Sequence, residues 1–187
     1  MEQISYDLLL SPQVQGFIHD HELDDEKNIV LKHKTIHGLP SHLVADQIAG
    51  RRKAKTKLPT YYQTAEIIYP PSLNVEQSSS EKTALLKRKI LDEACRKKDS
   101  LVDLTGGFGI DTYFLSLLLK AVHYTDPDND ILNIARHNHK TLGATNIYYH
   151  NITAESFLQQ PDFFDVIYID PSRRQASQTV FRLSDCE

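Results

Sequence analysis

From residue 78 onward, hydrophobic positions alternate between short apolar runs and stretches with helical spacing. The apolar runs predict strands at residues 101–104, 122–125, 146–150 and 165–169. Helical spacing predicts a first helix from residue 78 to about 98, then helices at 112–120, 131–142 and 154–159. Strands that alternate with helices are typical of an α/β fold with a parallel sheet and helices on both faces.

Residues 1–77 differ, because they show helix signals without strand alternation. Helices are predicted to begin at Pro12 and next to Pro40. Pro59, Pro70 and Pro71 interrupt helical spacing, so residues 58–77 are predicted to form an extended connection. The expected domains are a helical N-terminal region with that connection, 1–77, and an α/β domain, 78–187.

Composition narrows the class of protein. The chain has 187 residues, 40% of them hydrophobic and 25% charged, which fits a globular protein. A net charge of -4 argues against a wholly basic nucleic-acid protein. Cys95 and Cys186 lie outside any CxxC pattern, which excludes a cysteine-based zinc site. No apolar run is long enough for a membrane span or a signal peptide, so a cytoplasmic location is expected.

The nine histidines do not form a convincing metal pattern. Only His33 and His37 have the four-residue spacing that places two side chains on one helix face, and no HExxH-type acid accompanies them. We expect surface or capping histidines, including the pair His137 and His139, and no metal site.

The most informative segment is a predicted strand that ends in a glycine-rich turn before a helix, residues 102–112. Such a turn lets a ligand lie against the backbone. Asp103 is a carboxylate near the end of a strand that should be buried, so it either meets a cationic ligand group or fixes the loop through backbone N–H groups. Asp126 ends the next strand, 17 residues after Gly109, where a carboxylate can accept both hydroxyls of a ribose.

Residues 103–109 and Asp126 resemble the class I S-adenosylmethionine-dependent methyltransferases, with Thr105 in place of the usual first glycine. The third motif departs from the family, because Thr153 stands where an acid often contacts the adenine. The resemblance implies a partial Rossmann-like sheet of strand order 3-2-1-4 and S-adenosylmethionine as cofactor. It assigns cofactor binding to Asp103, Thr105, Gly106, Gly107, Gly109, Asp111, Asp126, Thr153 and Ala154.

Residues 164–174 resemble the Asp/Asn-Pro-Pro-aromatic motif of methyltransferases that act on nucleobase amines. In that family the acid and a backbone carbonyl orient the amine, so catalysis is mainly positioning. The resemblance gives the catalytic set as Asp170, Pro171, Ser172 and Arg173, where Ser172 replaces the second proline and Arg173 the aromatic. Alternatively, Asp170 pairs with a neighbouring arginine and only orders a loop.

Together with residues 69–81, these motifs look like a bacterial methyltransferase group with an N-terminal helical region and a C-terminal THUMP-like domain. They are also similar to the trimethylguanosine synthase group. The resemblance implies an RNA substrate. The basic run Arg51, Arg52, Lys53, Lys55 and Lys57 could bind an RNA backbone, although a solvated helix end is the alternative.

Two other functions stay open. A module that binds cofactor or RNA without turnover fits the replaced residues of the third and fourth motifs. An NAD-dependent oxidoreductase fits less well, because it needs G-x-G-x-x-G and Asp111 would face its pyrophosphate.

Chain length adds a last expectation. Only 16 residues follow Pro171, whereas methyltransferases of this class usually add three more strands. We therefore expect a fragment with an exposed sheet edge after the fourth strand, which could favour self-association. On its own it should bind cofactor weakly and not turn over.

Overall fold

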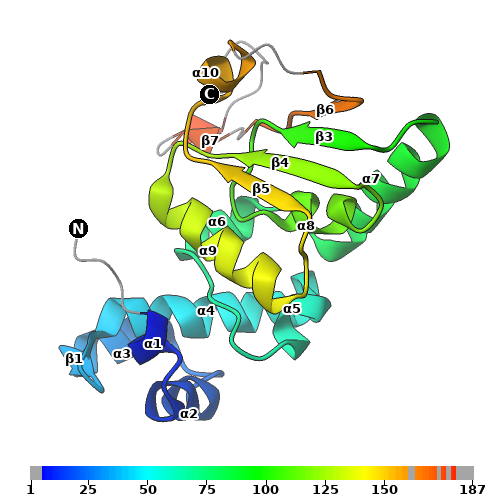
Figure 1. Cartoon of the computed structure of the whole chain (residues 1–187). Helices are drawn as coiled ribbons and strands as arrows, with labels where there is room; N and C mark the ends of the chain where they lie inside the picture. The colour runs from blue at the N-terminus through cyan, green and yellow to red at the C-terminus, as the bar shows by residue number, and fades with distance from the viewer. Residues whose placement is uncertain (1–5, 160–162, 172–173, 176–177, 180–187) are drawn as a thin grey trace. The chain divides into compact units, whose positions relative to one another are not determined.

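The computed structural model describes residues 6–159, 163–171, 174–175 and 178–179. The chain divides into two compact units, residues 1–76 and residues 77–187. Figure 1 labels most of the helices and strands of the two units.

The first unit is built from helices around the long helix α4 (Ser41–Lys57). Before it come α1 (Tyr6–Leu9), α2 (Pro12–Asp20), α3 (Glu26–Lys32) and an antiparallel hairpin of β1 (Thr35–Ile36) and β2 (Leu39–Pro40). Val44 and Ile48 of α4 are fully buried, together with Val14 of α2. The predicted helix starts near Pro12 and Pro40 are confirmed.

The predicted extended connection over residues 58–77 is wrong at both of its ends. Helices α5 (Pro59–Gln63) and α6 (Ser72–Gln77) occupy its two ends. Pro59 is the first residue of α5, where proline is favoured because the first N–H of a helix has no intrahelical partner. Leu58 and Tyr61 are fully buried, so apolar packing holds this turn in helical form.

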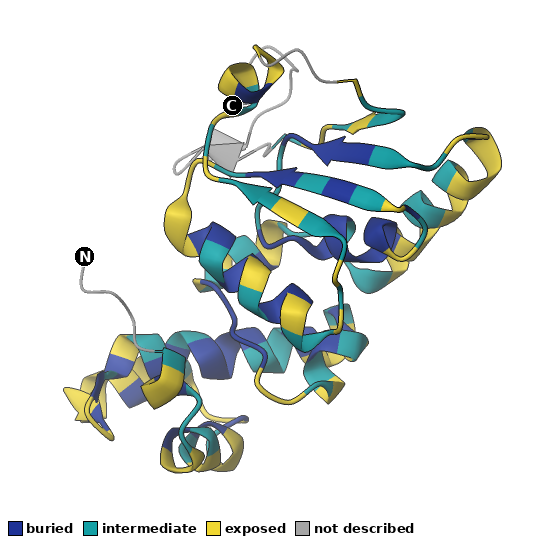
Figure 2. Cartoon of the chain, viewed as in Figure 1, coloured by how far each residue is buried: buried dark blue, intermediate teal, exposed yellow. Residues whose placement is uncertain are grey.

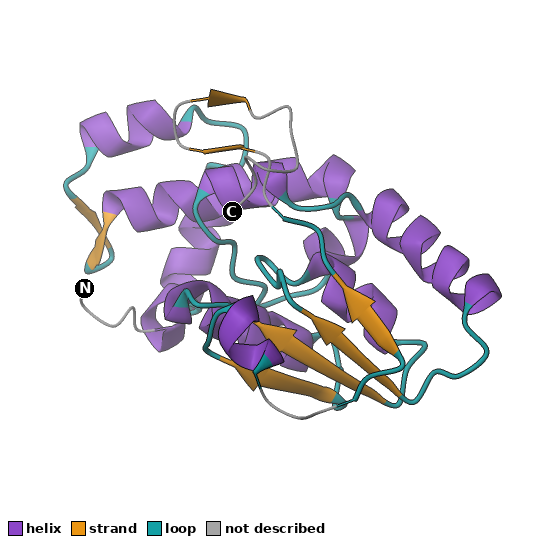
Figure 3. Ribbon diagram, turned by 90° about the horizontal axis from the view of Figure 1, so that it is seen from above, coloured by secondary structure: helices purple, strands orange, loops and turns teal. Residues whose placement is uncertain are grey.

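The second unit contains a parallel four-stranded sheet in the order β5-β4-β3-β6. Its strands are β3 (Ser100–Asp103), β4 (Ala121–Thr125), β5 (Ile147–His150) and β6 (Val166–Tyr168). The four arrows run in one direction in Figure 3. This confirms the α/β fold and the order 3-2-1-4, because β3 is the first strand along the unit and β6 the fourth.

Helices cover both faces of this sheet. On one face lie α7 (Glu81–Ala94), α8 (Ile110–Ser116) and α9 (Asn129–Thr141), whose side chains pack on Leu101, Val122 and Tyr124. On the other face α10 (Ala154–Leu158) places Phe157 against Val102. Figure 2 shows the central strands β3 and β4 more deeply buried than β5.

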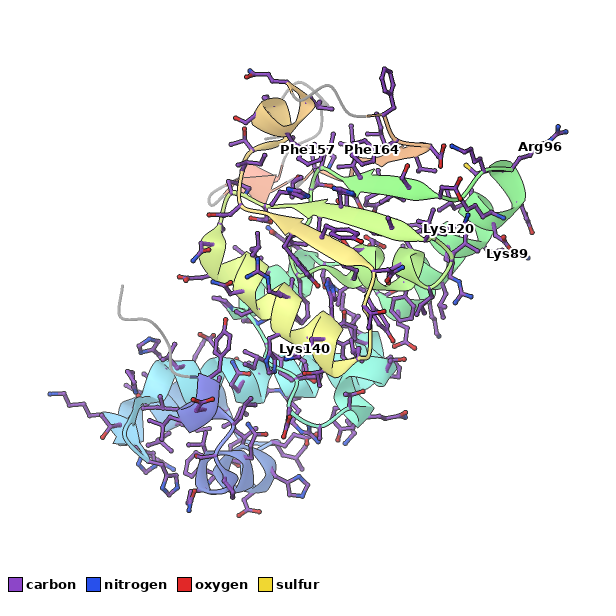
Figure 4. The ribbon with its side chains drawn as sticks, viewed as in Figure 1. Lys89, Arg96, Lys120, Lys140, Phe157 and Phe164 are labelled. Carbon is purple, nitrogen blue, oxygen red and sulfur yellow. The ribbon has the colours of Figure 1, made fainter. Side chains whose placement is uncertain are left out.

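Two details complete the second unit. The rings of Phe157 and Phe164 lie beside one another, with centroids 5.7 Å apart, and hold α10 over the segment before β6 (Figure 4). A short antiparallel pair, β7 (Arg174–Gln175) and β8 (Gln178–Thr179), follows β6.

No helix in the described ranges is long and apolar enough to cross a membrane.

Candidate functional site

The glycine loop joins β3 to α8 and is tied to the next strand. Gly106 N donates a hydrogen bond to Thr125 O at 3.0 Å. A Cβ atom at Gly106 would lie 2.3 Å from the ring of Tyr124, which is fully buried, and 2.8 Å from Thr125 O. Residue 106 must therefore be glycine for the loop to lie against β4.

Gly107 and Gly109 both have left-handed backbone conformations, with φ of 54° and 79°. Their surroundings differ. A Cβ at Gly109 would lie 2.6 Å from His139 Nε2, whereas a Cβ at Gly107 would meet only Thr105 O, at 3.8 Å. The loop thus leaves open space beside Gly107, where a ligand can approach the backbone.

The side chain of His139, in α9, contacts the glycine loop at Gly109. Its ring is fully buried, and burial lowers its pKa to about 4, so the imidazole is neutral near pH 7. Nε2 lies 2.9 Å from Gly109 O, which can only accept, so Nε2 carries the proton. Nδ1 then accepts from Tyr149 OH at 3.0 Å. The prediction of a surface or capping histidine is wrong for His139, because both ring nitrogens are satisfied inside the protein.

Asp103 lies at the end of β3 with 1% of its surface exposed. Its Oδ1 accepts from Thr105 N at 2.9 Å, and its Oδ2 accepts from Thr112 Oγ1 at 2.5 Å. Burial raises the pKa of Asp103 to about 6, and these hydrogen bonds offset part of the rise. Of the two roles considered for this carboxylate, the contacts match the one in which it fixes the loop.

Asp126 follows β4 and lies at the open side of the loop. Its Oδ2 accepts from Gly107 N and its Oδ1 from Asp128 N, both at 2.8 Å. Asn151 Nδ2 donates to the carbonyl of Asp126 at 3.0 Å, which holds this turn next to the end of β5. Burial raises the pKa of Asp126. Each carboxylate oxygen keeps a further lone pair with which it can accept from a ligand.

Thr153 and Ala154 follow β5 at the start of α10. Thr153 caps this helix, because its Oγ1 accepts from Ser156 N at 3.3 Å. Thr153 is exposed and Ala154 is half-buried. Both lie at the same edge of the sheet as Asp103 and Asp126, since each follows the carboxyl end of a parallel strand.

The fourth strand brings Asp170 to the glycine loop. Asp170 N donates to Thr105 Oγ1 at 2.8 Å, and the same hydroxyl lies 3.3 Å from Asp103 Oδ1. The threonine that replaces the usual first glycine therefore links both acids. Pro171 follows and is half-buried. Ser172 and Arg173, the other two predicted catalytic residues, lie outside the described residues.

Asp111, in the first turn of α8, lies among three side chains that the sequence analysis did not single out, Ser79, Lys87 and Tyr168. Its Oδ2 accepts from Ser79 Oγ at 2.7 Å and from Lys87 Nζ and Tyr168 OH, each at 2.9 Å. Lys87 Nζ also lies 2.8 Å from Asp170 Oδ2. We call Ser79, Lys87, Asp111, Tyr168 and Asp170 the lysine cluster.

Two properties of the lysine cluster bear on ligand binding. Asp111 Oδ1 is buried and has no hydrogen-bond partner among the described residues. Burial alone would lower the pKa of Lys87, but the hydrogen bonds to Asp170 and Asp111 outweigh it, and this pKa is raised. Lys87 is therefore charged at neutral pH, and Asp111 has an acceptor atom to offer.

The whole edge is acidic. Asp103, Asp111, Asp126 and Asp170 meet there, and Lys87 is the one cation whose contacts with them are described. Such an edge favours a cationic or hydroxyl-bearing ligand over a pyrophosphate.

The basic run in α4 is engaged within the first unit. Arg51 Nε lies 3.1 Å from Glu22 Oε2, and its guanidinium lies over the ring of Tyr62 at 4.6 Å. The other cations contact acids or carbonyl oxygens: Arg52 with Glu26, Lys53 with Ser72 and Glu76, Lys55 with Glu22, and Lys57 with the carbonyls of Val75 and Glu76. These side chains hold α4 to its neighbours, and their role toward RNA stays a prediction.

Among the described residues, no three His, Cys, Asp or Glu side chains lie together in a way that could hold a metal ion. Cys95, at the end of α7, is a half-buried free cysteine.

Comparisons with known proteins support the fold of the chain and say little about its function. Residues 108–187 match a family of proteins of unknown function, DUF1523. No curated protein matches the chain. Among solved structures, a putative methyltransferase from Porphyromonas gingivalis W83 is 26% identical over 92% of this chain, with a TM-score of 0.67. The chain spans 42% of the length of that protein.

Two further solved structures match a smaller part of this chain and have lower TM-scores. An rRNA methylase from Streptococcus thermophilus is 27% identical over 40% of this chain and 45% of its own, with a TM-score of 0.37. A putative methyltransferase from Streptococcus mutans, solved with S-adenosylhomocysteine, is 20% identical over 54% of this chain and 57% of its own, with a TM-score of 0.43. The likeness to the Porphyromonas structure, which extends over nearly the whole chain, supports the methyltransferase-type fold.

Proposed function

We propose that this chain is the cofactor-binding part of an S-adenosylmethionine-dependent methyltransferase that acts on a nucleobase amine in RNA. The observation that carries the proposal is the convergence of Asp103, Asp126 and Asp170 on one glycine loop at the carboxyl edge of the sheet. The likeness to a putative methyltransferase supports it.

The residues present suit this cofactor, which supplies a methyl group activated by its sulfonium. Asp126 would accept from the ribose hydroxyls beside the open space at Gly107. Asp111 Oδ1, buried without a described partner, would accept from the cofactor's ammonium group. Thr153 and Ala154 lie where the adenine would follow the ribose. Asp103 and Thr105 would act indirectly, by fixing the loop.

Asp170 would receive the acceptor amine. Its side chain is 46% exposed, so a substrate can reach the carboxylate from solvent. An amine that donates to this carboxylate has its lone pair oriented, and orientation alone contributes strongly to transfer rates. By the resemblance, Pro171, Ser172 and Arg173 would belong to the same acceptor site, and Arg173 would stack on a base or hold a phosphate.

One observation favours a second candidate, a binding module without turnover. Asp170 Oδ2 already accepts from Lys87 Nζ, and Tyr168 OH lies 3.3 Å away. If RNA brings no amine to the other carboxylate oxygen, Oδ1, these contacts would serve only to order the loop. An NAD-dependent oxidoreductase is disfavoured by the acidic edge, since a pyrophosphate would face Asp111.

The proposal also includes expectations that came from the sequence and from its resemblances. They are a THUMP-like domain elsewhere in the full protein, kinship with the trimethylguanosine synthase group, a cytoplasmic location, and RNA contacts by residues 51–57. The apolar side chains of β6 and its end also suit association, because Ile167 and Ile169 are more than half exposed.

Thermal-shift titrations with S-adenosylhomocysteine and NAD test the cofactor. Stabilisation by S-adenosylhomocysteine is expected, and stabilisation by NAD alone would refute the proposal. Transfer of a labelled methyl group to fractionated bacterial RNA by the complete gene product tests the reaction. Asp170→Ala should abolish transfer while cofactor binding is kept, and full activity of this variant would refute the role of Asp170.

A further inference from the structure

The ammonium group of Lys87 lies at the centre of the lysine cluster. Its Nζ is 2.9 Å from Ser79 Oγ, 2.9 Å from Asp111 Oδ2, 2.5 Å from Tyr168 OH and 2.8 Å from Asp170 Oδ2. An ammonium has three protons, so four acceptors at these distances already exceed its donor capacity. Lys87 therefore has no free donor to offer a further ligand while these contacts hold.

The cluster links two parts of the proposed site. Asp111 belongs to the helix that follows the glycine loop, and Asp170 follows the strand that presents the acceptor motif. Both carboxylates use their Oδ2 atoms toward Lys87, and Tyr168 OH lies between the same two atoms, at 2.9 Å and 3.3 Å. The cation is what allows two carboxylates to share this small volume.

Removal of the ammonium would have unequal effects on the two acids. The side chain of Asp111 is 12% exposed and is held by Ser79 as well, so it cannot turn away. The side chain of Asp170 is exposed to solvent and can rotate outward. Repulsion between like charges would therefore move Asp170, the residue proposed to receive the amine.

We propose that Lys87 is a positioning residue, whose ammonium holds the Asp170 carboxylate at a set place beside the glycine loop so that it can orient the acceptor amine. This inference rests on the proposed role of Asp170. Lys87 acts through Asp170 and not on the cofactor. Asp103 and Asp126 are fixed by contacts that do not involve it, and Asp111 keeps Ser79 and Tyr168 as donors when the ammonium is removed.

The direct test observes the contact itself and needs no activity. In this chain, labelled with ¹⁵N lysine, an ion-paired ammonium exchanges protons slowly and gives a ¹H–¹⁵N signal. We expect such a signal for Lys87, assigned by its loss in Lys87→Arg, and we expect Asp170→Asn to shift it. An unchanged Lys87 signal in Asp170→Asn would overturn the proposal.

The functional test compares Lys87→Met and Lys87→Arg in the complete gene product. The control is Lys89→Met, two residues along the same helix, where the lysine is exposed and pairs only loosely with Glu93 at 3.8 Å (Figure 4). Lys87→Met should lower kcat about 100-fold for methyl transfer to RNA, while the Kd for S-adenosylhomocysteine changes less than threefold. Lys87→Arg should recover activity to within tenfold, and Lys89→Met should match the wild type.

Three other outcomes would overturn the role of Lys87 or the proposed function. A more than tenfold loss of S-adenosylhomocysteine affinity in Lys87→Met, with no such loss for methylthioadenosine, would place the role of Lys87 at the amino-acid end of the cofactor, directly or through Asp111, and overturn the proposal. Unchanged kcat in Lys87→Met would also overturn it. If the wild-type protein neither binds S-adenosylhomocysteine nor transfers methyl groups, the proposed function fails, and the ammonium signal alone then decides whether Lys87 holds Asp170.

Discussion

Replacing Asp103 with Asn should stabilise the second unit near neutral pH, although it removes a charge from the proposed site. Burial raises the pKa of Asp103 from 3.8 to about 6. Between these two values the folded state binds a proton that the unfolded state does not, so stability falls as pH rises through this window. The rise in pKa corresponds to a loss of about 3 kcal/mol by pH 7.

Asn has the same shape as Asp and carries no charge to desolvate. Its Oδ1 can accept from Thr105 N as the carboxylate does, and its Nδ2 can donate to the hydroxyl of Thr112, which turns to accept. Because the loop contacts survive and Asp103 is buried away from ligands, the affinity for S-adenosylhomocysteine should change less than threefold.

Urea unfolding, followed by circular dichroism at pH 4.5, 6 and 7.5, measures the effect as a difference between variant and wild type. Between pH 4.5 and pH 7.5, the difference in free energy of unfolding between Asp103→Asn and the wild type should grow in favour of the variant by about 2 kcal/mol. Asp130→Asn, an exposed acid in the first turn of α9, should show no comparable trend. A difference that does not change with pH would refute the reasoning. A tenfold loss of S-adenosylhomocysteine affinity would instead show that Asp103 contacts the ligand.

Three further predictions concern the supports of the site and of the first unit. Gly106→Ala should lower the free energy of unfolding by about 1–3 kcal/mol and abolish S-adenosylhomocysteine binding, because its Cβ would overlap the buried ring of Tyr124. The control is Gly16→Ala in α2, where the added Cβ meets open space. This variant should be neutral or stabilise by up to about 1 kcal/mol. Urea titration and calorimetry measure both, and tolerance of Gly106→Ala would contradict the packing argument. His139 should remain neutral with its proton on Nε2 down to about pH 4, as read from ¹⁵N shifts, and stability should fall with acid through its contribution, since the unfolded chain takes up a proton at higher pH. Arg51→Gln should lower the free energy of unfolding, measured in urea, by about 1–3 kcal/mol, because the buried carboxylate of Glu22 keeps only weaker partners. Lys27→Gln, at an exposed position, should change this free energy little. Loss of RNA affinity in Arg51→Gln at unchanged stability would show instead that this side chain serves RNA.

The sheet could be predicted from the sequence because its strands are short apolar runs with little ambiguity. Leu101 and Val102 are fully buried on opposite faces of β3, as a continuous apolar run indicates. Asp103, the glycines and Asp126 could be identified from the sequence because apolar packing does not account for a glycine-rich turn or for acids at the ends of strands. Asp170 was found by resemblance to a motif.

The missed residues depend on contacts that spacing does not reveal. On α7 the apolar residues Leu86 and Ile90, at helical spacing, are more than half exposed, while Ala84, Lys87 and Leu91 face inward. A lysine is read as solvent-facing unless its carboxylate partners are known, and Asp111 and Asp170 are distant in sequence. His139 was misassigned for the same reason, since Gly109 and Tyr149 satisfy it only in the folded chain.

Calorimetric titration of this chain with S-adenosylhomocysteine tests the central claim most directly. We predict saturable one-to-one binding that Asp126→Asn weakens at least tenfold, because one hydrogen bond to a charged group contributes about 1.5–3 kcal/mol. NAD should give no binding under the same conditions. Absence of S-adenosylhomocysteine binding, or tighter binding of NAD, would contradict the assignment of this edge as a methyltransferase cofactor site.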